Sequence, residues 1–266
     1  MNPIFYTIIL AILLLTNHKS MAQEIVSYKL IWSDEFENQG LPDSTKWNYE
    51  QGCSIRNHES QYYTYKNINN AYCNNGILTL GAHLESVNNC TVTSASITTK
   101  GKFEFTYGKV EIRAKIPKGA GTWPALWMMA DSKKYGQWPK NGEIDLLESV
   151  GWDANKIHCN IHTEAYNHVK KTNKGKSIEV PNLYNEFHVY TLEWSTAELA
   201  FYMDDEIVFT YENETQVDDP TIWPYNRPFY LLMNLAIGGD WGGVKGVDTN
   251  IFPAKFEIDY VRVYQR

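Results

Sequence analysis

The chain has 266 residues, which is long enough to bury a sizeable core as one large β domain or as two small domains. Its 31 Asp and Glu residues outnumber its 24 Lys and Arg residues, and the formal net charge of −7 argues against a nucleic-acid-binding protein, which needs a basic surface to neutralise phosphates. Charged residues at 21% and hydrophobic residues at 43% argue against disorder, while aromatic residues at 14% can serve core packing, stacking on sugars, or both.

The N-terminal segment, residues 1–22, is expected to be a signal peptide. Its apolar stretch Ile8–Leu15 is too short to span a bilayer, which takes about 20 residues. Small residues stand three and one positions before Gln23, as signal peptidase requires. The basic residues that usually precede the apolar stretch are missing, and an uncleaved anchor is the alternative. We therefore expect an exported protein, secreted or periplasmic, that has no membrane attachment after cleavage.

Short alternating or β-branched runs follow, separated by turn signals about every ten residues, and this pattern predicts β-strands. In chain order they are Ile77–Leu84, Val110–Ile116, Phe187–Trp194, Glu198–Met203, Ile207–Tyr211, Phe229–Ala236 and Phe256–Tyr264. One short helix is expected near Asp131–Tyr135. Without an internal repeat or a Pro/Ser-rich linker, the sequence predicts one all-β domain, a sandwich or a barrel.

The four cysteines, Cys53, Cys73, Cys90 and Cys159, bear on export and on metal binding. None belongs to a CxxC pair, which weakens a zinc site or a thioredoxin-like site. Export permits disulfides, and we expect one bridge among the first three cysteines, with the pairing left open. Cys159 lies in a hydrophobic run and is expected to be a buried thiol.

Three carboxylates, Glu143, Asp145 and Glu148, lie within six residues among apolar neighbours. In a regular strand Glu143 and Asp145 would share one face, while Glu148 would point to the other, apolar face. A β-bulge at Leu146-Leu147 would bring all three to one face. Converging carboxyl groups suit glycoside hydrolysis, and close like charges raise the pKa of one member so that a general acid stays protonated. The alternatives are a solvated edge strand or a cation site.

Tryptophans flank this cluster. Trp123, Trp127 and Trp138 precede it, and Trp152 follows it. A group of flat rings beside a row of acids is typical of a platform for a sugar face, although any one tryptophan taken alone fits core packing better.

The runs WPALWMM (123–129), WPKNGEIDLLESVG (138–151) and MNLAIGGDWGG (233–243) resemble glycoside hydrolase family 16, especially its laminarinase-like branch of bacterial endo-β-1,3-glucanases. Similar signatures cover nearly all of residues 23–266, which the resemblance identifies as one catalytic domain. It implies a concanavalin A-like fold, a concave β-jelly-roll sandwich of two antiparallel sheets with an open cleft for a polysaccharide.

The resemblance also implies roles for the three acids. Glu143 is the expected nucleophile, Glu148 the general acid/base, and Asp145 the residue that orients and tunes them. The expected protein is a secreted, endo-acting, retaining hydrolase of laminarin-like β-1,3-glucan that works by double displacement, without a cofactor for catalysis. We expect it to be a monomer.

Six further residues match cleft positions of the family: Asn57, Trp123, Trp127, Trp138, His162 and Asn234. For His162, a purely structural role is the alternative. His158 and His162 have HxxxH spacing, but the glutamate of HExxH is missing, which argues against zinc. Many laminarinase-like members carry an arginine where this chain has Ser96, so its exact glucan preference stays open.

A structural calcium ion is a further expectation from the family. The matching positions are Glu35, the backbone carbonyl of Gly76, and Asp259, and oxygen ligands suit calcium. The alternative is that the two acids simply pair with basic neighbours.

The same residues also fit functions other than a β-1,3-glucanase. A mixed-linkage β-1,3-1,4-glucanase and a hydrolase of algal galactans would use the same acids with a differently shaped cleft. A non-catalytic, lectin-like glucan-binding module is less favoured, because binding alone does not need three converging acids.

Overall fold

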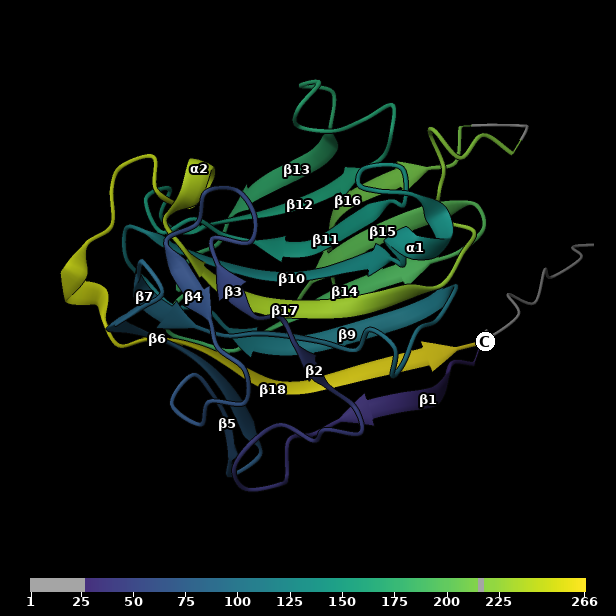
Figure 1. Ribbon diagram of the computed structural model, residues 1–266. Helices are drawn as coiled ribbons and strands as arrows, with labels where there is room; N and C mark the ends of the chain where they lie inside the picture. Colours follow the sequence, from purple (N-terminus) through teal and green to yellow (C-terminus); the bar gives the residue numbers. More distant parts are fainter. Residues whose placement is uncertain (1–26, 215–217) are drawn as a thin grey trace, which may run out of the picture.

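Two β-sheets stacked face to face make up most of the protein (Figure 1). The computed structural model describes residues 27–214 and 218–266, so the signal peptide predicted at residues 1–22 lies outside the described residues and stays a prediction. In the part that is described, no helix is both long and apolar enough to cross a membrane.

The larger sheet has eleven strands. Its main path runs, in spatial order, through β16 (Glu206–Glu212), β15 (Glu198–Met203), β14 (His188–Trp194), β9 (Gly108–Lys115), β18 (Ala254–Gln265), β6 (Ile77–Val87), β7 (Cys90–Ser94), β4 (Gln61–Tyr63) and β3 (Gly52–Cys53). Two more strands lie off this path: β1 (Lys29–Asp34) pairs with β18, and β5 (Ala71–Asn74) pairs with β6. Every pair in this sheet is antiparallel except β4 with β7, which is parallel.

The second sheet carries the chemistry-bearing residues. Its seven antiparallel strands run in the order β13 (Lys174–Glu179), β12 (Lys156–His162), β11 (Glu143–Glu148), β10 (Thr122–Ala130), β17 (Phe229–Ile237), β8 (Ser96–Thr98) and β2 (Asn48–Tyr49). The helical elements are short: α1 (Ser132–Tyr135), α2 (Gly239–Gly242) and a 3₁₀ turn (Thr249–Ile251).

The core fills the space between the sheets. Strand β9 shows why these residues form a sandwich, since Val110, Ile112 and Ala114 are fully buried while the residues between them are partly exposed. One continuous cluster of buried residues extends from Phe36 to Val263. All seven predicted strands are present, with ends within three residues of the expected bounds, and the short helix is α1. The predicted all-β jelly-roll sandwich is confirmed.

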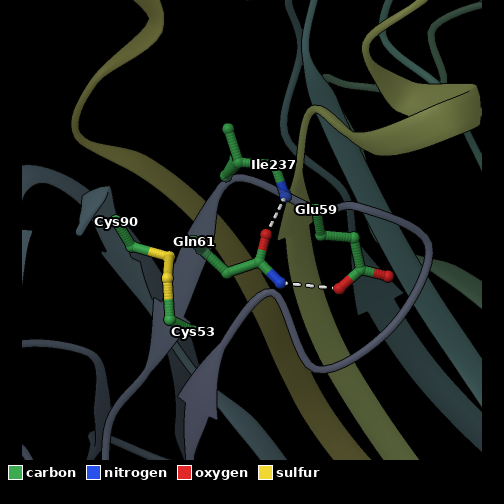
Figure 2. Close-up of a disulfide and its surroundings, with 5 residues drawn as sticks. All are labelled: Cys53, Glu59, Gln61, Cys90 and Ile237. Carbon is green, nitrogen blue, oxygen red and sulfur yellow. Dashed lines mark hydrogen bonds between the residues drawn. A yellow bond between two sulfur atoms is a disulfide. The ribbon is translucent and has the colours of Figure 1, made fainter. Parts of the chain in front are cut away.

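A disulfide joins Cys53 of β3 to Cys90 of β7, as Figure 2 shows. This is one bridge among the first three cysteines, as expected. Cys73 and Cys159 are buried free thiols. Burial raises the pKa of Cys73 to about 12, so this thiol stays protonated.

Candidate active site

The floor of the site is strand β11, whose three acids share the outer face of the seven-stranded sheet. Glu143, Asp145 and Glu148 each lie opposite a residue of β10. Their partners there are Met129, Trp127 and Ala125, in that order.

A β-bulge brings the three acids to this face. Leu147 pairs with Leu126 of β10 and Asp145 pairs with Trp127, which leaves Leu146 as the extra residue. Both Leu146 and Leu147 are buried in the core between the sheets. The predicted bulge is therefore confirmed. Because of the extra residue, two successive leucines face the core and Glu148 stays on the outer face with the other two acids.

Two side chains hold the carboxylate of Glu148 in place. The Trp123 indole Nε1 donates to Oε1 at 3.1 Å, and the Asn160 amide Nδ2 donates to Oε2 at 3.3 Å. Asn160 comes from β12, where it is the register partner of Asp145. Each carboxylate oxygen of Glu148 thus has one neutral donor.

His162, also on β12, lies beside the other two acids. Its Nε2 is 3.4 Å from Asp145 Oδ2 and 3.9 Å from Glu143 Oε1. The side chains of His162 and Asp145 are 6% and 3% exposed, so this contact is shielded from water. His162 is therefore in contact with the acid cluster.

Burial raises the pKa of all three carboxyl groups. It brings the pKa of Glu143 to about 8, with the charge of Asp145 adding to the effect and His162 opposing it. Burial and the charge of Glu148 hold the pKa of Asp145 well above its usual range, and burial also raises the pKa of Glu148. Raised pKa values in a cluster of acids favour a proton being retained near neutral pH, as a general acid requires.

A cavity of about 490 Å³ lies over these acids. Five of the six predicted cleft residues line it: Asn57, Trp123, Trp127, Trp138 and Asn234. The sixth, His162, contacts the acids from one side. Trp152, the fourth flanking tryptophan, is not among the residues that line this cavity. It packs against the cluster that contains Trp123, and its Nε1 donates to the Trp241 carbonyl at 2.6 Å.

A chain of hydrogen bonds fixes the wall around Trp127. Its Nε1 donates to Asn234 Oδ1 at 2.8 Å, and the Asn234 amide donates to the Tyr63 hydroxyl at 3.0 Å. Gln61 continues the wall: its amide nitrogen donates to Glu59 at 2.7 Å, while its oxygen accepts from the Ile237 backbone N–H at 2.8 Å, as Figure 2 shows. Buried amides of this kind hold the wall rigid because losing a partner would leave polar groups unsatisfied.

The loop between β3 and β4 presents Asn57 to the cavity. The Asn57 carbonyl accepts from the backbone N–H of Asp240 at 2.9 Å, which ties the loop to α2. A Cβ atom at Gly239 would lie 2.8 Å from that carbonyl, and Gly239 has a φ of +75°. Only glycine fits this approach without displacing the loop.

Arg56, next to Asn57, is a cavity residue that the sequence pattern did not single out. Its guanidinium is paired with the carboxylate of Glu50 and lies 5.1 Å from the centre of the Trp127 ring. The Ser96 hydroxyl donates to the same Glu50 carboxylate at 2.6 Å. Ser96 stands where many laminarinase-like members carry an arginine, and here the guanidinium that contacts Glu50 comes from Arg56 on the β3–β4 loop.

Other residues of the site were missed as well: Glu59 lines the cavity, and Asn160 bonds to Glu148. Glu59 is almost fully buried, and burial raises its pKa. Asn160 could have been found, because strand alternation puts residues 158, 160 and 162 on one face. Arg56 and Glu59 had no such signal, since they lie on a loop whose path depends on distant contacts.

Two metal sites were considered in the described part of the chain. Glu143, Asp145 and His162 each offer one ligand atom, all within 4.8 Å of one another, but these are the acids of the active site. The calcium set fits poorly. Both oxygens of Glu35 accept from Arg262, at 3.0 and 2.8 Å, and Asp259 is paired with Arg113. These acids pair with basic neighbours, which was the alternative to calcium.

Three converging acids with raised pKa values, held on strand β11 beneath a cavity lined by tryptophans, are the arrangement of a glycoside hydrolase. The family model "Glycosyl hydrolases family 16" matches residues 56–262, and the chain belongs to this family.

The comparisons with individual proteins agree with this. A beta-glucanase of Rhodothermus marinus is 46% identical over 244 residues, which cover 90% of this chain and 85% of the relative. The crystal structure of the laminarinase from Rhodothermus marinus matches with a TM-score of 0.87 at 46% identity, covering 90% of this chain and 98% of that one. A keratan-sulfate endo-1,4-beta-galactosidase of Sphingobacterium multivorum is 35% identical over 90% of this chain, but the match covers only 55% of the relative.

Proposed function

We propose that the protein is an exported, endo-acting hydrolase of β-1,3-linked glucan that retains the anomeric configuration. The observation that carries this proposal is the bulged strand β11, which aligns Glu143, Asp145 and Glu148 beneath the cavity. The chain's membership of glycoside hydrolase family 16 and its 46% identity to a beta-glucanase support β-glucan as the substrate class.

In the first chemical step the ionised carboxylate of Glu143 attacks the anomeric carbon, while Glu148 carries the proton of the acid cluster and gives it to the departing glycosidic oxygen. Trp123 and Asn160 each donate to one oxygen of Glu148 and so hold this carboxyl group in place beneath the cavity. The products are a glycosyl ester on Glu143 and a shortened chain with a free hydroxyl.

In the second step Glu148, now ionised, takes a proton from water as the water attacks the anomeric carbon. The ester bond breaks, Glu143 returns to its free form, and Glu148 is protonated again. Asp145 and His162 lie beside Glu143. The charge of Asp145 raises the pKa of Glu143 and His162 lowers it, so these two neighbours help to set the pH at which Glu143 ionises. No step uses a cofactor.

The linkage is tested by the products released from laminarin, lichenan, agarose and carrageenan. We expect oligosaccharides from laminarin, with a lower yield from lichenan and none from the two galactans. Release from galactans alone would overturn the glucanase proposal in favour of the algal galactan hydrolase. Binding of laminarin without any cleavage would favour the lectin-like module.

Export, subunit number and calcium have their own tests. We expect the mature protein to begin at Gln23, as N-terminal sequencing of exported material would show, and to sediment as a monomer. Because Glu35 and Asp259 are already paired with arginines, we expect a calcium chelator to leave the melting temperature unchanged.

A further inference from the structure

The side chain of Asn57 lines the active-site cavity, where an amide can present either its carbonyl oxygen or its NH2 group to a ligand. Its Nδ2 donates to Glu59 Oε1 at 3.2 Å. In the described part of the chain, no protein group donates to its Oδ1 within hydrogen-bond distance. The oxygen of Asn57 is therefore the atom left for a ligand, as long as the amide keeps this orientation.

Two chains of hydrogen bonds fix the orientation of the groups around Glu59, and the first begins at Ile237. The backbone N–H of Ile237 can only donate, and it donates to the side-chain oxygen of Gln61 at 2.8 Å, as Figure 2 shows. The Gln61 NH2 group is then left to donate to Glu59 Oε2 at 2.7 Å. Turning the Gln61 amide round would set two donors against each other at Ile237 and two acceptors against each other at Glu59.

The second chain begins at the indole of Trp127, which can also only donate. Its Nε1 donates to Asn234 Oδ1 at 2.8 Å, and the Asn234 amide donates to the Tyr63 hydroxyl at 3.0 Å. The single hydrogen of that hydroxyl is then donated to Glu59 Oε2, at 3.5 Å between the two oxygens. Both chains therefore begin at a group that cannot accept, and both end at the same oxygen of Glu59.

A carboxylate is the group that satisfies all three of these neighbours. Glu59 is 3% exposed, so little water can reach it to replace a missing partner. Its Oε2 accepts from Gln61 and Tyr63, which leaves Oε1 to accept from Asn57. Burial raises the pKa of Glu59, while the charge of Arg56 and the side-chain hydrogen bonds lower it and so favour the ionised form. An ionised Glu59 has no hydrogen to donate, and a reversed Asn57 would place oxygen against oxygen.

We propose that Glu59 is a positioning residue that sets the hydrogen-bond polarity of Asn57, so that Asn57 presents an acceptor oxygen to a hydroxyl group of the bound glucan. The inference rests on the proposed function, because it takes the ligand of the cavity to be that glucan. Glu59 acts through Asn57 rather than on the reacting bond, so its replacement should change KM much more than kcat.

The test is a cycle of exchanges between amide and acid at these two positions, with kcat and KM measured on laminarin. In Glu59→Gln, the oxygen of the new amide must face the donors of Gln61 and Tyr63, so its NH2 group faces Asn57. Asn57 then turns its own oxygen towards that group and its NH2 group towards the cavity. We expect KM to rise about 10-fold, with kcat within about 2-fold of the wild-type value.

Asn57→Asp is the reciprocal single variant. It sets two acceptors against each other and should also raise KM. In the double variant Glu59→Gln/Asn57→Asp, the new amide donates to one oxygen of the new aspartate, whose other oxygen faces the cavity as an acceptor. Its KM should be lower than that of either single variant and within about 3-fold of the wild-type value. If one single variant does not fold, the double variant compared with the other single variant gives the same answer.

Asn70→Asp is the matched control, because it makes the same exchange in a buried network that does not line the cavity. The Asn70 amide donates to the Gly81 carbonyl at 2.9 Å and to the Thr93 hydroxyl at 3.1 Å. This variant should lower the melting temperature and leave KM unchanged.

Two results would overturn the role of Glu59. One is an unchanged KM in Glu59→Gln. The other is a double variant no better than the single variants, which would mean that Asn57 donates to the sugar instead of accepting from it. If the wild type cuts only another polysaccharide, the glucanase proposal fails by itself, and the same cycle measured on that polymer still tests Glu59.

Discussion

The acids of this protein differ sharply between the two sheets. On the larger sheet Glu35 pairs with Arg262, Asp259 with Arg113, and Glu257 with Lys115. On the seven-stranded sheet the acids of β11 have no lysine or arginine within salt-bridge distance among the described residues, and they crowd one another instead. The hydrogen bond from Arg262 lowers the pKa of Glu35, whereas burial and mutual repulsion raise the pKa of the β11 acids.

The difference shows which acids do chemistry. An acid in a surface ion pair stays ionised, and the pair contributes little to the free energy of folding. In a buried acid that faces other acids, the ionised form is unfavourable and the pKa is raised. Groups with such shifted pKa values concentrate at functional sites. The predictions below test this contrast.

The largest effect is expected for the nucleophile. Glu143→Gln keeps the size and burial of the side chain but removes the attacking oxygen, so hydrolysis of laminarin should fall by at least about 10³-fold. Glucan binding should persist, as a titration with laminarin would show. Glu257→Gln, which breaks a pair on the other sheet, is the control and should keep near-wild-type activity. A Glu143→Gln enzyme with substantial activity would refute the nucleophile assignment.

Glu148→Ala tests the acid/base and should cost about 10²- to 10⁴-fold in kcat. Azide needs no base, and it can enter the space left by the carboxylate and release the glycosyl ester. We expect rescue with a β-glycosyl azide as product, identified by NMR. An α-azide would mean direct attack on the substrate and would contradict a double displacement.

Sequence pattern was sufficient for the strands and for the three acids, because alternation and short spacing are local properties. The bulge could also be anticipated, since a regular strand would have placed Glu148 among core leucines. Contacts between segments that are far apart in the chain could not be predicted from these local patterns. The pairing of Glu35 with Arg262 joins residues 227 positions apart, and Arg56 reaches the cavity because its loop is tied to α2 and β17.

Arg56 departs from the contrast in a way that bears on substrate binding, because it lines the cavity and forms an ion pair with Glu50 on the catalytic side. If it binds sugar hydroxyls, Arg56→Gly should raise KM for laminarin about 10-fold with little change in kcat. Ser96→Arg alone should be worse than the wild type, since Ser96 is fully buried and Glu50 is already occupied.

The double variant Arg56→Gly/Ser96→Arg frees Glu50 for the new guanidinium. We expect its KM to return towards the wild-type value, so the two substitutions should be clearly non-additive. Additive losses would show that a guanidinium from position 96 cannot replace Arg56.

The smallest expected effect is on stability, and its sign differs between the two sheets. The pKa of Glu143 is raised from 4.5 to about 8, so between these pH values the native state binds more protons than the unfolded state. The free energy of unfolding therefore falls as pH rises through this range. Glu143→Gln should therefore raise the melting temperature by a few degrees at pH 8 and less at pH 5. Glu35 has a lowered pKa and stabilises the fold above its unfolded pKa, a contribution that is lost as pH falls, so Glu35→Gln should lower the melting temperature slightly at pH 8. Thermal denaturation of the two variants at both pH values measures the difference. Shifts of the melting temperature with the same sign at pH 8 would contradict the contrast between the raised pKa of Glu143 and the lowered pKa of Glu35.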